Sequence, residues 1–209
     1  QLLPETPELA ALDVARVKHL VAQGAVVVDV RPAAAFAEGH VPGSLSIPLR
    51  DQFATWLGWL LDDTTGLVFV VDAAQDTSEI LWQAYKIGHE RLLGRLDGGV
   101  PAWHAAGEAL KSLQFATANR LPDRRYLDVR QKSEYADGHI GGALHIEFGG
   151  LAGYDGEVPA SIVVGCGHGE RAMTAASVLQ RAGNTDVAVL DGGPQDYATA
   201  HHRSMRTGI

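Results

Sequence analysis

The sequence of 209 residues has a single cysteine, no long hydrophobic run and no excess of positive charge. With only Cys166, the chain cannot form an internal disulfide, so its fold does not depend on an oxidising compartment. No apolar stretch approaches the roughly 20 residues that a membrane-spanning helix needs. The formal net charge of −8 argues against a nucleic-acid partner, which would select a basic surface. We therefore expect no membrane segment and no nucleic-acid binding.

The chain also lacks an initiator Met and any secretory or transit signal at its N-terminus, where it begins QLLP. We expect it to be processed or excised from a longer polypeptide, and to be cytoplasmic. Its length and its hydrophobic content of 46% suffice for one large domain or two small ones.

An internal repeat indicates that the chain has two domains. Two blocks of sequence recur in the same order, the first after 99 positions and the second after 94. The blocks and their counterparts are VDVR at 28–31 with LDVR at 127–130, and LDGG at 96–99 with LDGG at 190–193. Chance does not readily place two blocks in the same order, so the pattern indicates tandem domains. We assign them to residues 1–112 and 113–209.

Each copy alternates segments typical of strands and helices. In the first copy, the patterns predict helices over 9–23, 53–61, 78–87 and 100–106, and strands over 25–30, 66–71 and 95–96. The second copy is shorter, and its segment 113–121 reads as a linker or a first strand. Continuous valine-rich strands between helices predict a parallel sheet covered on both faces. The expected fold is α/β, with two tandem domains that are each a parallel sheet flanked by helices.

Cys166 opens the loop CGHGER at 166–171, between a predicted buried strand at 161–164 and a predicted helix at 172–180. Backbone N–H groups and the positive end of the helix dipole converge at such a turn and favour a thiolate, which is the nucleophilic form. Gly167 and Gly169 allow a tight backbone, and Arg171 adds a fixed charge that can hold an anion. A lone cysteine is often only a small buried apolar residue. In this setting we interpret it as catalytic.

The repeat allows a comparison of the two loops. Carrying the offset of 94 back from Cys166 leads to Asp72, and Thr77 then takes the place of Arg171. A carboxylate cannot act as a sulfur nucleophile and would repel anionic substrates. We therefore predict that domain 1–112 is catalytically silent and that domain 113–209 is catalytic.

Other residues occur in both copies and are interpreted as structural. Asp128, Arg130 and His139 match Asp29, Arg31 and His40 of the silent copy. Their presence without the cysteine suggests hydrogen bonds that tie loops together and brace turns.

With these residues in view, the sequence resembles the rhodanese family of sulfurtransferases, in a tandem form with an inactive first domain. The resemblance rests on LDVRQKSEYADGHIGGA at 127–143, on the CGHGER loop and on the LDGG block. Trp103 completes the final motif in the first copy, whereas Tyr197 takes that place in the second. The resemblance implies that sulfur is carried as a persulfide on Cys166. It also implies that a six-residue loop handles sulfur, whereas related phosphatases and arsenate reductases use seven residues.

The mechanism expected from this resemblance is a sulfur relay. The Cys166 thiolate would take sulfur from thiosulfate or a low-molecular-weight persulfide and pass it to a thiol acceptor or to cyanide. Arg171 would act with Cys166 as a catalytic residue and bind the anionic group of the donor. The backbone of Gly167, His168, Gly169 and Glu170 would bind the substrate sulfur.

The sequence leaves the roles of two side chains of the loop open. His168 either orients the donor and tunes the thiolate, or is an exposed spacer. Glu170 points outward, pairs with a nearby Arg, or biases the site from doubly charged thiosulfate towards a persulfide. The sequence assigns no metal ligands and no cofactor.

The resemblance extends to the C-terminal part of fusions with a metallo-β-lactamase-fold hydrolase, and implies an upstream metallo-hydrolase whose metal site lies outside this chain. Two other functions stay open. One is a non-enzymatic persulfide sensor or scaffold, in which the first copy docks a partner. The other is an arsenate reductase or cysteine-dependent phosphatase, which the length of the loop disfavours.

Overall fold

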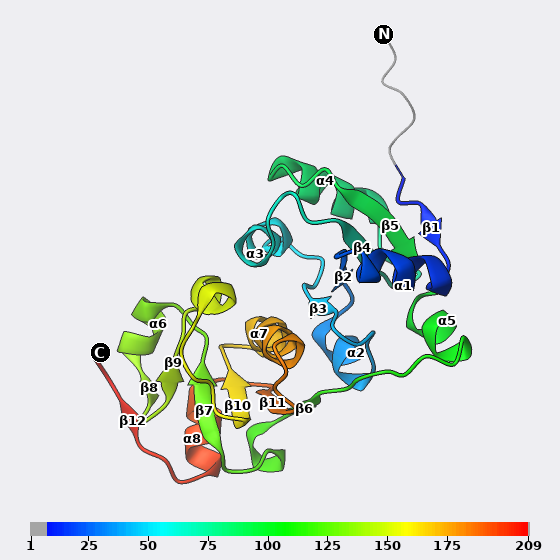
Figure 1. Cartoon of the computed structure of the whole chain (residues 1–209). Helices are drawn as coiled ribbons and strands as arrows, with labels where there is room; N and C mark the ends of the chain where they lie inside the picture. Colours follow the sequence, from blue (N-terminus) through cyan, green and yellow to red (C-terminus); the bar gives the residue numbers. More distant parts are fainter. Residues whose placement is uncertain (1–7, 209) are drawn as a thin grey trace. The chain divides into compact units, whose positions relative to one another are not determined.

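The computed structural model describes residues 8–208, and the chain forms two compact units, one ending at Lys111 and the next beginning at Ser112. Each unit has its own sheet and helices (Figure 1) and its own hydrophobic core. In the described part of the chain, no helix is long and apolar enough to cross a membrane.

The first unit is a five-stranded parallel sheet with helices between the strands. Its elements are β1 (Ala11–Leu12), α1 (Val14–Ala22), β2 (Val26–Asp29), α2 (Ala33–Glu38), β3 (Leu45–Ser46), α3 (Phe53–Leu60), β4 (Leu67–Val70), α4 (Thr77–Lys86), β5 (Leu92–Leu96) and α5 (Gly99–Ala105). The strand order is β1-β5-β4-β2-β3.

The second unit repeats this topology. Its elements are β6 (Gln114–Ala116), the 3-10 helix η1 (Ala118–Arg120), β7 (Arg125–Asp128), α6 (Lys132–Asp137), β8 (His139–Ile140), β9 (Leu144–His145), the 3-10 helix η2 (Phe148–Gly153), β10 (Ser161–Gly165), α7 (Glu170–Arg181), β11 (Asp186–Leu190), α8 (Pro194–Ala200) and β12 (Met205–Arg206). The strand order β6-β11-β10-β7-β9 matches that of the first unit, and β12 pairs antiparallel with β8. The predicted fold is confirmed.

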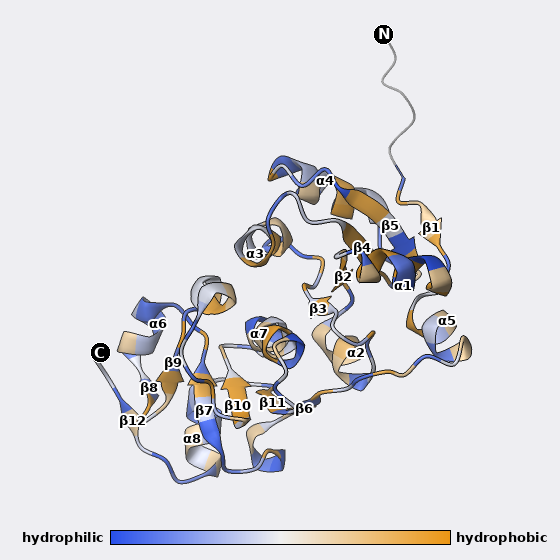
Figure 2. Ribbon diagram, in the orientation of Figure 1, coloured by the Kyte–Doolittle hydropathy of each residue, from blue (hydrophilic) through white to orange (hydrophobic). Residues whose placement is uncertain are grey.

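The central strands β4 and β10 are mainly apolar, as Figure 2 shows. β2 and β4 are buried at every residue, because helices cover both faces of the sheet. In the first unit, Val27, Val68 and Val70 pack with residues of α1 and with Trp103 of α5. In the second unit, Val163 and Tyr126 pack with Tyr197 of α8. The sheets therefore fix the strand ends to which the loops attach.

The prediction of one helix over 9–23 is wrong at its start. Ala11 and Leu12 instead form β1, which pairs with Arg95 and Leu96 of β5. The helix begins only at Val14, because the Asp13 side chain accepts a hydrogen bond from the Arg16 backbone N–H at 2.7 Å and caps the helix. The segment 113–121, read as linker or strand, contains the strand β6 followed by η1.

Candidate active site

Cys166 lies directly after β10, where the strand ends and the loop to α7 begins. β10 lies between β11 and β7, so the loop emerges at the carboxyl edge of the sheet. The side chain of Cys166 is a free thiol and is only 2% exposed. A nucleophile placed this way is shielded from bulk water and faces the N-terminus of a helix of 12 residues.

The loop offers backbone donors. Within residues 8–208, the N–H groups of Gly167, His168 and Gly169 donate to no protein acceptor. Gly169 caps α7 in the left-handed region, with φ 84° and ψ −25°. The side chain of His168 is exposed. The unsatisfied N–H groups and the helix N-terminus together suit an anion at this position.

Gly169 also packs too tightly to carry a side chain. A Cβ atom added there would lie 2.7 Å from Cε2 of Phe115 and 3.2 Å from the carbonyl oxygen of Leu190. Both neighbours belong to strands of the same sheet, β6 and β11. The left-handed backbone and these contacts therefore both require glycine here.

Arg171 is held by Glu134 of α6. Its Nη1 donates to Oε2 of Glu134 at 2.6 Å, and its Nη2 donates to Oε1 at 2.8 Å. These hydrogen bonds are the main reason that the pKa of Glu134 falls from 4.5 to about 2, so the carboxylate is ionised at neutral pH. The pKa of Arg171 is raised, first by its hydrogen bonds to Glu134 and to a smaller extent by Cys166. Its Nη2 also lies 3.9 Å from the position that a Cβ would take on Gly167, the residue after Cys166.

Sequence reasoning missed Glu134, because 37 residues separate it from Arg171 and no local pattern links the two. One signal was available. Glu134 has Ala35 as its counterpart in the first copy, 99 positions earlier. The structure also fixes where Glu134 stands, since its Oε2 accepts a hydrogen bond from the Gln131 backbone N–H in the capping box of α6.

The residues shared by both copies have the same structural role in each unit. Arg130 Nη2 donates to Asp128 at 2.6 Å and to the Gly138 carbonyl at 2.7 Å. In the first unit, Arg31 makes the corresponding bonds to Asp29 at 2.7 Å and to the Gly39 carbonyl at 2.8 Å. These ion pairs join the end of a strand to the end of the next helix.

The two histidines that follow are likewise structural. His139 stacks on Tyr135 with ring centroids 3.8 Å apart, and His40 stacks on Phe36 at the same separation. In each case Nδ1 lies within hydrogen-bond distance of the carbonyl oxygen of the stacked residue, at 3.0 Å for His139 and 2.8 Å for His40. Each ring is thereby tied to the end of its short helix.

The first unit has no thiol in the corresponding loop. Strand pairing matches the residues of the two loops one position differently from the sequence offset of 94. Asp29 lies opposite Val70, whereas its counterpart Asp128 lies opposite Gly165. When positions are matched by strand pairing, Val71 therefore corresponds to Cys166, and Asp72 corresponds to Gly167. The pairing of β4 with β5 is irregular between Leu67 and Val68, which accounts for the offset of 94 found downstream in the sequence.

In the first unit, side chains of the loop form hydrogen bonds with nearby backbone groups. The Asp72 backbone N–H donates to Oε1 of Gln75 at 2.9 Å, and Nε2 of Gln75 donates to the carbonyl oxygen of Val30 at 2.7 Å. Asp76 caps α4 by accepting from the Ser78 N–H at 2.8 Å. A side chain of this loop therefore takes up the backbone donor of Asp72, whereas its counterpart in the second unit, the N–H of Gly167, donates to no protein acceptor among the described residues.

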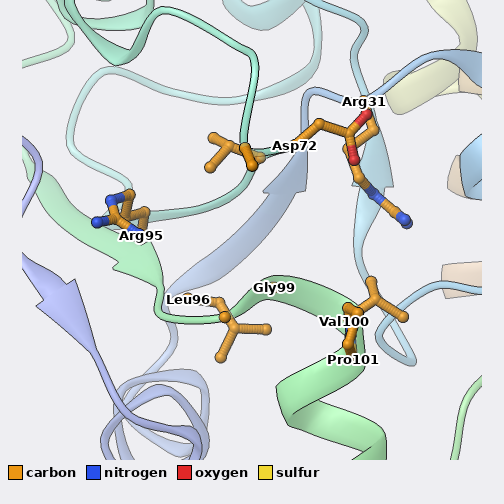
Figure 3. Close-up of a pocket in the computed structure, with 10 residues that line it drawn as sticks. Arg31, Asp72, Arg95, Leu96, Gly99, Val100 and Pro101 are labelled. Carbon is orange, nitrogen blue, oxygen red and sulfur yellow. The ribbon is translucent and has the colours of Figure 1, made fainter.

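A pocket of about 280 Å³ lies beside this loop of the first unit. Figure 3 shows Asp72 and Arg31 along one side, with Leu96 of β5 and Val100 and Pro101 of α5 on the other. The pocket combines charged and apolar walls without a nucleophile. In the described residues, no group of three or more His, Cys, Asp or Glu side chains is placed to hold a metal ion.

The second unit is thus an α/β domain with a thiol on the loop between a parallel strand and a helix, and with an arginine on the first turn of that helix. The chain belongs to the rhodanese family. The family model for the rhodanese-like domain matches residues 13–106 and again 112–200. The chain is therefore a tandem of two rhodanese-like domains.

Several relatives of this chain are thiosulfate sulfurtransferases. The thiosulfate sulfurtransferase GlpE of Pseudomonas fluorescens (strain SBW25) is 33% identical over 97 residues, covering 46% of this chain and 89% of that protein. A thiosulfate sulfurtransferase of Pseudomonas aeruginosa is 27% identical over 178 residues, covering 62% of this chain and 65% of that protein. A crystal structure of thiosulfate sulfurtransferase from Pseudomonas aeruginosa has a TM-score of 0.44 at 18% identity, and covers 96% of this chain and 44% of that one.

Proposed function

We propose that this chain is a sulfurtransferase that carries sulfane sulfur as a persulfide on Cys166. The observation that carries the proposal is the placement of the only cysteine, which lies in a loop with free backbone N–H groups and beside the Arg171 guanidinium. Relatives with thiosulfate sulfurtransferase activity in their names support the same reaction class.

In the first step, the Cys166 thiolate attacks the outer, sulfane sulfur of the donor. With thiosulfate, a new S–S bond forms to Cys166, the S–S bond of thiosulfate breaks, and sulfite leaves with the electron pair. With a low-molecular-weight persulfide, the leaving group is the corresponding thiolate. The charge is conserved in both cases, and no external oxidant or reductant is needed.

In the second step, an acceptor thiolate or cyanide attacks the outer sulfur of the Cys166 persulfide. The bond between the two sulfur atoms breaks, and its electron pair returns to Cys166 as thiolate. The acceptor leaves as a persulfide or as thiocyanate, and the enzyme regains its starting state.

The loop supplies the groups that this relay needs. The N–H groups of Gly167, His168 and Gly169 stabilise the negative charge on sulfur, together with the N-terminus of α7 at Glu170. Cys166 contributes to the raised pKa of Arg171, so the guanidinium is close enough to act on sulfur bound at Cys166. We assign these loop residues to substrate binding, and Cys166 and Arg171 to catalysis.

The first unit has a structural or docking role in this proposal. Its loop has Val71 and Asp72 in place of a thiol, and Gln75 occupies the backbone donor of Asp72. An upstream metallo-hydrolase partner, implied by the resemblance to fusion proteins, stays a prediction. So does the alternative in which Cys166 stores a persulfide as a sensor without turnover.

Intact mass spectrometry tests the proposal. Wild type and Cys166→Ser are incubated with thiosulfate, and separately with glutathione persulfide. We expect one added sulfur atom in wild type only, removed by cyanide or by a thiol. Catalytic formation of thiocyanate over many turnovers separates an enzyme from a sensor. Absence of the adduct with both donors would contradict sulfur transfer by this chain.

A further inference from the structure

The ion pair between Glu134 and Arg171 occurs only in the unit that has the cysteine. Ala35 stands at the position of Glu134 in the first unit. The position of Arg171 corresponds to Thr77 by the sequence offset and to Asp76 by the strand register, and neither is a cation. Both partners are therefore absent where the thiol is absent.

The ion pairs that support the fold behave differently. The pair of Asp128 with Arg130 recurs as the pair of Asp29 with Arg31 in the silent unit. The repeat thus provides an internal comparison, in which structural residues persist and residues tied to the chemistry are lost together. Glu134 belongs to the second group.

The geometry of the ion pair limits how strongly Arg171 can attract an anionic sulfur donor. Both terminal nitrogens of its guanidinium donate to Glu134, in a bidentate arrangement that is the strongest an Arg can form with a carboxylate. An anionic donor that approaches Cys166 therefore meets an arginine whose charge is already balanced. The free backbone N–H groups of the loop are left to bind the sulfur itself.

The net charge near the thiol is then unfavourable for a dianion. The thiolate and Glu134 are both negative, and Arg171 offsets only one of these two charges. A second negative charge on the donor is repelled over a few ångströms, and added salt screens the repulsion. A donor with a single negative charge, located on the sulfur to be transferred, avoids most of this repulsion.

We propose that Glu134 determines the charge of the donor: by binding the Arg171 guanidinium, it makes the site favour monoanionic persulfides over dianionic thiosulfate. The inference rests on the proposed function, since it concerns the same sulfur-accepting site. Glu134 acts through Arg171 and is a specificity-determining residue without contact to the reacting atoms.

The test measures the rate of persulfide formation on Cys166 by quenched intact mass spectrometry. Thiosulfate is compared with 2-hydroxyethyl persulfide, which carries a single negative charge at neutral pH. The variants are Glu134→Gln, which removes the charge, and Glu134→Asp, which keeps it. Glu147→Gln is the matched control, because Glu147 also accepts a hydrogen bond from a backbone N–H at the start of α6, that of Lys132 at 2.9 Å, but does not bind Arg171.

In Glu134→Gln, we expect the ratio of the thiosulfate rate to the persulfide rate to rise by about three- to tenfold. Glu134→Asp and Glu147→Gln keep the ratio of the wild type. Added salt raises the thiosulfate rate in the wild type, because it screens repulsion, and raises it less in Glu134→Gln. A structural role of Glu134 would change neither the ratio nor its salt dependence.

Two results would overturn the inference while leaving the relay intact. One is an equal change of both rates in Glu134→Gln, and the other is a thiosulfate rate in the wild type that does not rise with salt. The second measurement needs no variant, so it decides even if a substitution disturbs folding. If the wild type takes up sulfur from neither donor, the proposed function itself is contradicted.

Discussion

Arg130 closes on the fully buried carboxylate of Asp128, with Nε 2.9 Å from Oδ1 and Nη2 2.6 Å from Oδ2. The partners are two residues apart in sequence, at the point where β7 leaves the sheet. The same arrangement of Arg31 and Asp29 in the first unit shows that the pair belongs to the fold and not to the chemistry.

Arg130→Met is therefore expected to destabilise the second unit strongly. The substitution leaves the buried charge of Asp128 uncompensated, which costs roughly 3–5 kcal/mol of the free energy of unfolding. Urea denaturation measures this loss. As a control, Arg124→Met removes an exposed pair with Asp186 and should cost less than about 1 kcal/mol. Equal losses in the two variants would refute the structural role assigned to Arg130.

Gly169→Ala is expected to distort the loop that follows Cys166. A left-handed φ costs an alanine about 1–2 kcal/mol, and the added methyl group would also press on Phe115. Gly167→Ala is the matched comparison, because a Cβ there would have Arg171 Nη2 at 3.9 Å as its nearest neighbour. Thermal unfolding should show a clear loss for position 169 and little change for position 167.

The double variant Gly169→Ala with Phe115→Ala checks the cause of that loss. If the contact contributes, removing the ring should recover part of the stability beyond the effect of Phe115→Ala alone. If nothing is recovered, the backbone conformation alone accounts for the effect.

The stability contributed by Glu134 should depend on pH in a defined direction. Because the bond to Arg171 lowers the pKa of Glu134 from 4.5 to about 2, the ionised form stabilises the folded state. This contribution is complete above pH 4.5 and is lost as the pH falls towards 2. Both side chains are partly exposed, so it amounts to at most about 1 kcal/mol. Urea denaturation of wild type and Glu134→Gln should converge below pH 4.5, and a constant difference down to pH 2 would contradict this.

A cysteine placed in the first unit should not acquire sulfur. We expect Val71→Cys and Asp72→Cys, each made in a Cys166→Ser background, to show no sulfur adduct with either donor. Gln75 occupies the backbone donor of Asp72, and the loop has no arginine at its helix start. Intact mass spectrometry checks this, and an adduct at either position would show that the internally bonded loop can still carry sulfur.

Much of the fold followed from local pattern. Strand periodicity placed β2, β4 and β10 within a residue or two, because their burial on both faces leaves a continuous apolar run. The helix over 9–23 was predicted too long, because nothing local shows that Ala11 and Leu12 pair with β5. Strand pairing of so short a segment depends on a partner more than 80 residues away, as between Ala11 and Arg95.

The sequence by itself determined the tandem organisation, the lack of a cysteine in the first copy and the loop from Cys166 to Arg171, because repeats, glycines and a single thiol are visible without any partner residue. Only the tertiary structure showed that Glu134 binds Arg171, that Phe115 requires a glycine at position 169, and that Val71 takes the place of Cys166. These depend on contacts and strand registers between segments far apart in the chain, which local propensity does not encode and which arise only when the sheet brings those segments together.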